Sequence, residues 1–356
     1  MNKRENIISL YKRKDYEFVP VSFNLCPSLV EEYIRQTGDK TGNYQEYFDL
    51  DVRTVDGFPV LPQDNNQFKK YYGFELREGS TIDNYGVAHM PGSEAAMHMT
   101  EMVNPMEKFT SVKEMKSYPF PTFDLSFETE MKKQVIALHE KGYAVCFDKA
   151  CTIWEGSWYM RGMENLMCDM LMEDEMATYL LDKITAISKE LICSAVRSGV
   201  DMVHTGDDIG MQSTIMMSKE MYRKWLKPRL TEIISAAKAI NPDVIIIYHS
   251  CGFVEPFIED LAEAGVDVLN PVQPECMDFG ELHAAHGDKI SFNGTLGTQT
   301  TMPFGTPEEV SATTIKNLDI AGAKGGLVPC PTHLLEPEVP WANIMAFVEA
   351  CRGYKK

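Results

Sequence analysis

The stretch Val244-Ile-Ile-Ile-Tyr-His-Ser-Cys-Gly252 contains a strand and the polar turn that ends it. Its first five residues are β-branched or aromatic, and both alternating faces are apolar. This pattern is typical of a parallel strand that is covered by helices on its outer face. Polar residues and a glycine follow at once, so we expect the chain to turn away there. The stretch therefore predicts a buried parallel strand whose carboxyl end carries reactive side chains.

Further short apolar runs precede and follow this stretch, and amphipathic segments separate them. One segment opens at Ser218 and continues to about Ile240, another begins with Thr306-Pro-Glu-Glu309, and the last extends from Glu336 to Ala350. Repeated alternation of strand and helix predicts a parallel sheet in an α/β fold. With the strand at 244–248, the runs approach the eight strands of a closed (β/α)8 TIM-type barrel. The other expected strands are 19–23, 143–147, 201–204, 266–269, 290–292 and 325–329.

The N-terminal third is less regular than the rest of the chain. Residues 50–120 are rich in Gly, Pro, Asn and aromatic residues, and we expect long loops that embellish one barrel mouth. We interpret residues 1–356 as a single barrel domain, with the embellishment inside 1–120 and regular strand–helix repeats in 121–356. A doubly wound open sheet is the alternative fold. It would need a glycine-rich phosphate turn after an early strand, and the sequence has none.

Composition and charge exclude several classes of function. The 356 residues are 44% hydrophobic, and 34 basic against 52 acidic side chains give a net charge of −18. This charge argues against nucleic acid or an anionic membrane as the main partner. No apolar run reaches the roughly 18 residues that a membrane span needs, and the start has no apolar signal core, so we expect a cytoplasmic protein. The nine cysteines are an odd number without framework spacing and should be reduced thiols.

The strand end at 249–252 predicts a metal site. Side chains two residues apart on a strand share a face, so His249 and Cys251 should both point into the barrel mouth. An imidazole and a thiol together suit zinc. The last strand ends at the same rim, where Cys330 or His333 would supply a third ligand. Three protein ligands and one open position are typical of catalytic zinc.

Other polar strand ends supply candidates for the surrounding site. Asp207 and Asp208 are adjacent, so at most one of them points inward. We select Asp207 as the catalytic residue that would tune or occupy the open metal position, and the alternative for both acids is helix capping and loop hydrogen bonding. Glu155 follows the strand at 143–147 and is the other catalytic candidate, as a labile metal ligand or as a hydrogen-bond acceptor for a ligand, with an exposed residue on the rim as the alternative. We expect Tyr248, Asn270 and Gln273 to line the substrate site. Two further histidines, His89 and His98, lie in the embellishment and are interpreted as structural or surface residues.

Several of these stretches together resemble the uroporphyrinogen decarboxylase superfamily of barrels. The resemblance is greatest to its branch of zinc- and cobalamin-dependent methyltransferases, in which the residues that match His249 and Cys251 bind zinc and a cysteine near the end of the last strand completes the set. Counting back from Pro340, the third zinc ligand falls on His333, whereas the nearby thiol is Cys330. Both therefore stay candidates, with a slight preference for Cys330. The stretches that carry the resemblance are 118–121, 154–155, 206–212, 221–228, 249–252, 270–273 and 339–343.

The resemblance implies an enzyme that transfers a methyl group between a small molecule and the cobalt of a separate corrinoid protein. We favour O-demethylation of a methoxylated, aromatic compound, in which zinc would stabilise the charge on the leaving oxygen. The ground for this preference is an aromatic-rich N-terminal third that could form an apolar pocket, with a place in the core as the alternative for the same residues. The aromatic residues concerned are Phe48, Phe58, Phe68, Tyr71, Tyr72, Phe74 and Tyr85.

Three alternatives stay open. Methylcobalamin could instead donate its methyl group to a thiol such as coenzyme M. A metal-free decarboxylase is another member of the superfamily, but decarboxylases carry an arginine-rich substrate motif near the N-terminus. The stretch Asn24-Leu-Cys-Pro-Ser28 contains no arginine, which counts against this activity. The third alternative is a non-catalytic barrel that stores zinc or scaffolds a corrinoid partner.

Overall fold

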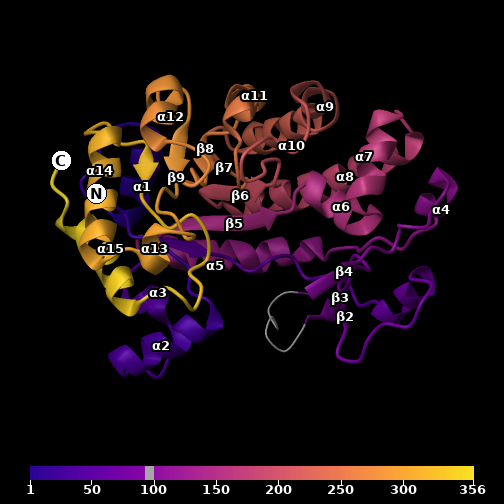
Figure 1. Cartoon of the computed structure of the whole chain (residues 1–356), viewed down its shortest axis with the longest axis horizontal. Helices are drawn as coiled ribbons and strands as arrows, with labels where there is room; N and C mark the ends of the chain where they lie inside the picture. The colour runs from indigo at the N-terminus through magenta and orange to yellow at the C-terminus, as the bar shows by residue number, and fades with distance from the viewer. Residues whose placement is uncertain (93–99) are drawn as a thin grey trace.

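Seven parallel strands form the central sheet of the computed structural model, which describes residues 1–92 and 100–356 (Figure 1). The strands lie side by side in sequence order, which is the arrangement of a TIM-type α/β fold and confirms the predicted fold class. His98 lies outside the described residues. The strands are β1 (Val52–Thr54), β5 (Ala144–Ala150), β6 (Met202–Gly206), β7 (Ile245–His249), β8 (Val268–Asn270), β9 (Ser291–Asn293) and β10 (Leu327–Val328).

The register of the sheet brings the strand ends into one row. Ala150 of β5 pairs with Gly206 of β6, Gly206 pairs with His249 of β7, and His249 pairs with Asn270 of β8. Six strands, from β5 to β10, coincide with runs that the apolar pattern predicts. Because their carboxyl ends share one edge, the polar residues that follow each strand meet at the same mouth.

The first strand differs from the prediction. It is β1, within the segment expected to be loops, whereas residues 19–23 form no regular strand. The backbone N–H of Val21 donates to the Asp51 carboxylate at 2.9 Å, so a side chain replaces a ladder acceptor. Pro20 lacks an N–H and cannot complete a ladder. Farther along, the N–H of Cys26 donates to the Leu335 carbonyl at 3.0 Å. Residues 19–26 therefore bridge the chain before β1 and the chain after β10 without forming a regular strand.

Helices cover the outer face of the sheet and their starts follow the expected signals. The Ser218 hydroxyl accepts the N–H of Met221, and Thr306 forms a capping box with Glu309. The segment predicted from 218 to 240 is two helices separated at Leu226, and the last helix begins after Pro340 rather than at 336. The helices are α5 (Glu128–Glu140), α8 (Glu175–Ser198), α9 (Lys219–Trp225), α10 (Lys227–Ile240), η4 (Glu255–Phe257), α11 (Ile258–Ala264), α12 (Phe279–His286), α13 (Thr301–Phe304), α14 (Pro307–Ala321) and α15 (Trp341–Gly353).

The N-terminal part contributes helices and a small antiparallel sheet of β2, β3 and β4 that lies apart from the C-terminal helices (Figure 1). Phe68 and Tyr72 are buried in a second apolar core beneath this sheet, together with Leu180 and Ile184 of α8. None of the helices in the described ranges is long and apolar enough to cross a bilayer. The remaining elements, of which α6 and α7 follow β5, are α1 (Lys3–Tyr11), α2 (Pro27–Thr37), α3 (Tyr44–Tyr47), η1 (Asn65–Tyr71), β2 (Thr81–Ile82), β3 (Ala88–Pro91), β4 (Thr100–Val103), α4 (Val112–Lys116), η3 (Leu125–Phe127), α6 (Trp154–Arg161) and α7 (Met163–Leu171).

Candidate functional site

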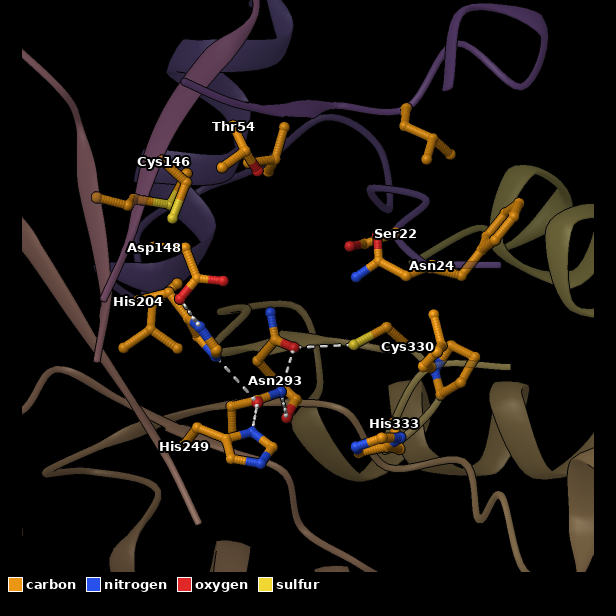
Figure 2. A pocket seen from close by; sticks show the side chains of 18 of the residues that line it. Ser22, Asn24, Thr54, Cys146, Asp148, His204, His249, Asn293, Cys330 and His333 are labelled. Atoms are coloured by element: carbon orange, nitrogen blue, oxygen red, sulfur yellow. Dashed lines mark hydrogen bonds and ion pairs between the residues drawn. The ribbon is translucent and has the colours of Figure 1, made fainter. Parts of the chain in front are cut away.

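A cavity of about 350 Å³ opens at the carboxyl ends of the strands (Figure 2). Alternate residues of each strand face it, since successive side chains of a strand point to opposite sides. Its wall therefore contains Asp148 of β5, His204 of β6, His249 of β7, Asn270 of β8 and Asn293 of β9. The N-terminal segment adds Ser22, Phe23 and Asn24, and the segment after β10 adds residues 330–334.

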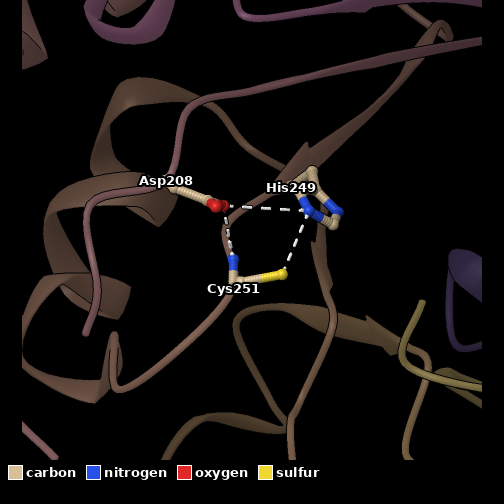
Figure 3. A group of neighbouring side chains, drawn as sticks. All are labelled: Asp208, His249 and Cys251. Carbon is tan, nitrogen blue, oxygen red and sulfur yellow. Dashed lines mark hydrogen bonds and ion pairs between the residues drawn. The ribbon is translucent and has the colours of Figure 1, made fainter. Parts of the chain in front are cut away.

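Three side chains converge at one side of this mouth (Figure 3). The Cys251 Sγ lies 3.5 Å from the His249 Nε2, and the Asp208 Oδ1 lies 3.8 Å from the same nitrogen. Nitrogen, sulfur and oxygen all lie within 4.8 Å of one another. Asp208 also accepts the backbone N–H of Cys251 at 2.8 Å, which ties the carboxylate to the thiol's own backbone. An imidazole, a thiol and a carboxylate thus surround one point, as metal ligands do.

A chain of amides orients the imidazole of His249. Its Nδ1 lies 2.7 Å from the Asn270 Oδ1, while the Asn270 amide group donates to the Asn293 Oδ1 at 2.9 Å. Because that donation fixes the Asn270 oxygen as an acceptor, Nδ1 carries the hydrogen and the Nε2 lone pair faces Cys251. Burial lowers the pKa of His249, and neighbouring His204 lowers it further. His249 is therefore a neutral imidazole whose free nitrogen can bind a metal.

The thiol of Cys251 is protonated in the absence of a cation. Burial raises its pKa to about 12, and the negative charges of Asp208 and Glu155 add to this effect. A bound cation would reverse this balance, since metal ligation takes the proton from a thiol. The electrostatics of the cluster therefore favour a positive ion among these three groups.

Cys330 and His333 line the same cavity as His249 but do not belong to the three-residue cluster. The Cys330 thiol donates to the Asn293 Oδ1 at 2.8 Å, and His333 lies across the cavity from His249 (Figure 2). His333 also lines an adjacent hollow together with Cys251. The structure thus brings all four predicted ligands to one mouth, and the choice between Cys330 and His333 stays a prediction.

The two adjacent acids after β6 are placed in the opposite way from the prediction. Asp207 is buried and accepts the backbone N–H groups of Ile153 and Glu155 at 3.0 and 2.9 Å. Burial raises its pKa to about 7. Asp207 therefore anchors the first turn of α6, and Asp208 is the acid that faces His249 and Cys251. The selection of Asp207 is corrected in favour of Asp208.

Glu155 lies directly behind this acid. Its Oε2 accepts the backbone N–H of Asp208 at 3.0 Å, and its Oε1 accepts the Tyr159 hydroxyl at 2.8 Å. Burial and the charge of Asp208 raise the pKa of Glu155. Its position, adjacent to Asp208 rather than in the cavity wall, allows it to influence the cluster through charge and through the Asp208 backbone.

The three expected substrate-site residues have different surroundings. Asn270 lines the cavity, and Gln273 lines the adjacent hollow, where it accepts the Gly252 N–H at 3.0 Å. Tyr248 is buried on the helix-covered side of β7, and its hydroxyl contacts the Asp207 carbonyl at 3.4 Å. Because Tyr248 alternates with His249 along the strand, it cannot face the cavity. The expectation that Tyr248 contacts substrate is therefore corrected.

Sequence reasoning missed two polar residues of the cavity wall. The His204 Nδ1 lies 3.2 Å from the Asp148 Oδ1, and the His204 Nε2 lies 3.4 Å from the Asn270 Oδ1. A signal for both was present, because His204 and Asp148 are polar residues on the inward face near the carboxyl ends of their strands. Alternation from Met202 and Cys146, which also face the cavity, would have identified them.

Comparisons with known proteins find sequence relatives named uroporphyrinogen decarboxylase and a solved structure of the same fold. It is 30% identical to the uroporphyrinogen decarboxylase of Chlorobium luteolum over 185 residues, 51% of this chain and 50% of that protein. It is 23% identical to the uroporphyrinogen decarboxylase of Chlorobaculum parvum over 271 residues, 75% of this chain and 72% of that protein. The chain spans about half the length of most of the curated relatives that it matches.

A solved structure described as a methyltransferase from Methanosarcina mazei aligns over 98% of both chains with a TM-score of 0.66. At 16% sequence identity this likeness shows the fold alone. The family model for uroporphyrinogen decarboxylase (URO-D) matches residues 145–354, which contain six of the seven sheet strands and every candidate metal ligand. Because that match covers more than half of its length, the chain belongs to the uroporphyrinogen decarboxylase family.

Proposed function

We propose that the protein is a zinc-dependent methyltransferase that moves a methyl group from a small methoxylated compound to the cobalt of a corrinoid carried by a separate protein. The observation that carries this proposal is the convergence of the His249 Nε2, the Cys251 Sγ and the Asp208 Oδ1 beside a cavity of ligand size. A thiol in such a cluster has no role in a metal-free decarboxylation. The fold of the methyltransferase from Methanosarcina mazei is compatible with the proposal.

The donor atoms fit a zinc ion. Zinc binds nitrogen at about 2.0–2.1 Å and sulfur at about 2.3 Å in a tetrahedron, so the two donors should lie roughly 3.6 Å apart. The His249 Nε2 and the Cys251 Sγ are 3.5 Å apart before any metal is considered. These two residues would hold the ion, and Cys330 or His333 would complete the set from across the mouth. Asp208 would occupy the open position of the zinc ion. When no ion is bound, it would hold the site together through its hydrogen bond to the Cys251 backbone.

The bound zinc ion would supply Lewis-acid stabilisation of the negative charge that develops on the leaving oxygen as the C–O bond breaks. The residues of the chain prepare the site for this step. Asn270 keeps the proton of His249 on Nδ1, and Asp208 fixes the backbone of Cys251. Glu155 in turn holds the backbone of Asp208. The electron pair of the broken C–O bond would stay on the substrate oxygen, and the methyl acceptor would be reduced cobalt(I) of the partner's corrinoid, which brings its own electron pair, so no residue of the chain would become methylated.

The composition of the cavity argues against the decarboxylase alternative that the names of the relatives suggest. None of the cavity-lining side chains in the described part of the chain belongs to Lys or Arg. A polycarboxylate porphyrinogen would then lose its hydration without gaining a counter-charge. Transfer to a thiol acceptor would use the same three-residue cluster and stays the second candidate, because a metal at this site would also make a thiol acidic.

The proposal is tested with purified protein, cob(I)alamin and a panel of methoxy compounds. We expect about one zinc ion per chain by elemental analysis and methylcobalamin formation by absorbance. Cys251→Ala should lower metal affinity and turnover by roughly 10- to 100-fold or more. Loss of a residue that only hydrogen-bonds to a metal ligand already costs this much, and Cys251 would be a ligand itself. Cys193→Ala, on α8 and away from the cavity, should behave as wild type. Full zinc content and full turnover in Cys251→Ala would refute the assignment, and activity that survives chelation would favour the decarboxylase.

A further inference from the structure

The cavity wall carries one charged group that the proposed chemistry does not use. Asp148 lies at the carboxyl end of β5, and its side chain is 55% exposed. Its Oδ1 accepts the backbone N–H of Ala150 at 3.0 Å and contacts the His204 Nδ1 at 3.2 Å. Its Oδ2 accepts no hydrogen bond from the residues that the structure describes, and Figure 2 shows it turned into the cavity. One carboxylate oxygen is thus anchored and the other is available to a ligand.

The cavity wall contains few charged side chains. Within the described ranges, Asp148 is the only acidic residue that lines the cavity, and no Lys or Arg lines it. The side chains whose charges lower the pKa of Asp148 are His204 and His249. Partial burial would raise the pKa of Asp148, but the hydrogen bond and charge of His204 lower it below its usual range. Asp148 is therefore ionised at neutral pH, with His204 on its Oδ1 and its Oδ2 open to the cavity.

The position of Asp148 relates this charge to the reactive end of the cavity. His204 lies between the two, and its ring centroid is 5.6 Å from that of His249. Asp148 contacts one nitrogen of His204, and the other nitrogen faces Asn270, which holds His249. A small molecule whose oxygen reaches the metal cluster would therefore place its far end near Asp148. The remaining wall offers neutral hydrogen-bonding groups, including Ser22, Asn24 and Thr54 (Figure 2).

We infer that the cavity selects methyl donors that carry a positively charged ammonium group at the end remote from the methoxy group, and that Asp148 is the specificity-determining residue. This inference rests on the proposed function for the identity of the reacting group. A carboxylate, sulfonate or phosphate at the same end would face Asp148 and find no Lys or Arg in the described part of the cavity wall. An uncharged hydroxyl would bind with intermediate strength, because it can donate to Asp148 without a full charge.

The test uses three compounds of nearly equal shape: 3-methoxybenzylamine, 3-methoxybenzyl alcohol and 3-methoxybenzoate. Binding to the zinc-loaded protein is measured by calorimetry, so no corrinoid partner is needed. We expect the dissociation constant of the amine to be at least about 10-fold lower than that of the benzoate, with the alcohol between them. This is the difference expected from one hydrogen bond to a charged group. Asp148→Asn should weaken the amine about 10-fold and leave the alcohol nearly unchanged. Asp243→Asn, an exposed acid that pairs with Lys12 outside the cavity, is the matched control.

The outcomes separate this inference from the proposed function. Tighter binding of the benzoate than of the amine, or an Asp148→Asn variant that binds the amine as wild type does, overturns the role of Asp148. Demethylation of the benzoate at the highest rate would also overturn it while supporting methyl transfer. Selective amine binding that disappears in Asp148→Asn supports the inference even if no compound of the set is demethylated, in which case the proposed function fails alone.

Discussion

Asn270 determines which nitrogen of His249 is free to bind a metal. Its oxygen accepts from Nδ1, and its own amide group is held by Asn293. We predict that Asn270→Leu lowers zinc affinity by about 10- to 100-fold, since the ring loses the group that fixes its tautomer and orientation. Asn270→Asp should retain most of the affinity, because a carboxylate can accept the same hydrogen. Competition with a chromophoric chelator measures both variants, and wild-type affinity in Asn270→Leu would contradict this role.

At the scale of the residue, the sequence predicted which residues meet at the cavity mouth better than it predicted the direction of each side chain. His249 and Cys251 were recognisable because a spacing of two places both on one face of a strand. The choice between Asp207 and Asp208 failed because the backbone changes direction at Gly206, which has φ +145°. The loss of regular alternation there cannot be read from residue types. Tyr248 was misplaced for a simpler reason, since alternation from His249 would have put it on the helix side.

At the scale of the element, Gly206 joins the end of β6 to the end of β7. A Cβ at this position would lie 2.1 Å from the His249 carbonyl oxygen. We predict that Gly206→Ala lowers the free energy of unfolding by about 2–4 kcal/mol, because the clash is with backbone that cannot move aside alone. Gly353→Ala, where nothing lies within 4 Å, is the control and should change it little. Equal urea midpoints for both variants would show that the strand ends are not packed this closely.

The irregular edge beside β1 should give stability a pH dependence. Burial raises the pKa of Asp51, which accepts the N–H of Val21, to about 6. The folded state then holds this proton more tightly than the unfolded state, so the free energy of unfolding falls as pH rises from about 4 to about 7. Two pKa units correspond to about 3 kcal/mol at most. Asp51→Asn should remove this slope. Unfolding titrations at pH 5 and pH 8 should show that the free energy of unfolding of the variant, relative to that of wild type, is higher at pH 8 than at pH 5. An unchanged difference between the two proteins at both pH values would contradict it.

Six of the seven strands could be predicted because parallel strands are apolar on both faces and are followed by recognisable helix caps. β1 could not, since a strand of three residues with Arg53 at its centre has no apolar run. Residues 19–23 have the apolar pattern of a strand, but the N–H of Val21 donates to a side chain, and the backbone bonds to Leu335 are made only farther on, by Asn24 and Cys26. Pairing of this kind depends on tertiary contacts that local sequence does not encode.

For the whole molecule, the fold should not depend on the metal. Two apolar cores, one inside the barrel and one beneath β2–β4, account for the buried side chains. We therefore predict that chelation abolishes methyl transfer but leaves the far-ultraviolet circular dichroism unchanged and lowers the melting temperature only by the linkage of metal binding to the folded state. Loss of secondary structure on chelation would indicate a structural rather than a catalytic metal.

The aromatic residues that suggested an aromatic substrate belong largely to these cores. Phe48, Phe58, Phe68 and Tyr72 are buried, and none of them lines the cavity. Composition predicted a large core correctly but could not separate core aromatics from a binding pocket. The cavity chemistry instead comes from strand-end residues such as Asp148 and Asn293, which become neighbours only through the sheet register.

The central claim is that His249 and Cys251 bind one metal ion together. Zinc K-edge X-ray absorption on the purified protein tests it most directly. We predict nitrogen or oxygen scatterers at about 2.0–2.1 Å with one or two sulfurs at about 2.3 Å, and the loss of one sulfur in Cys251→Ser. A first shell without sulfur, or a spectrum that the Cys251→Ser substitution leaves unchanged, would contradict the account.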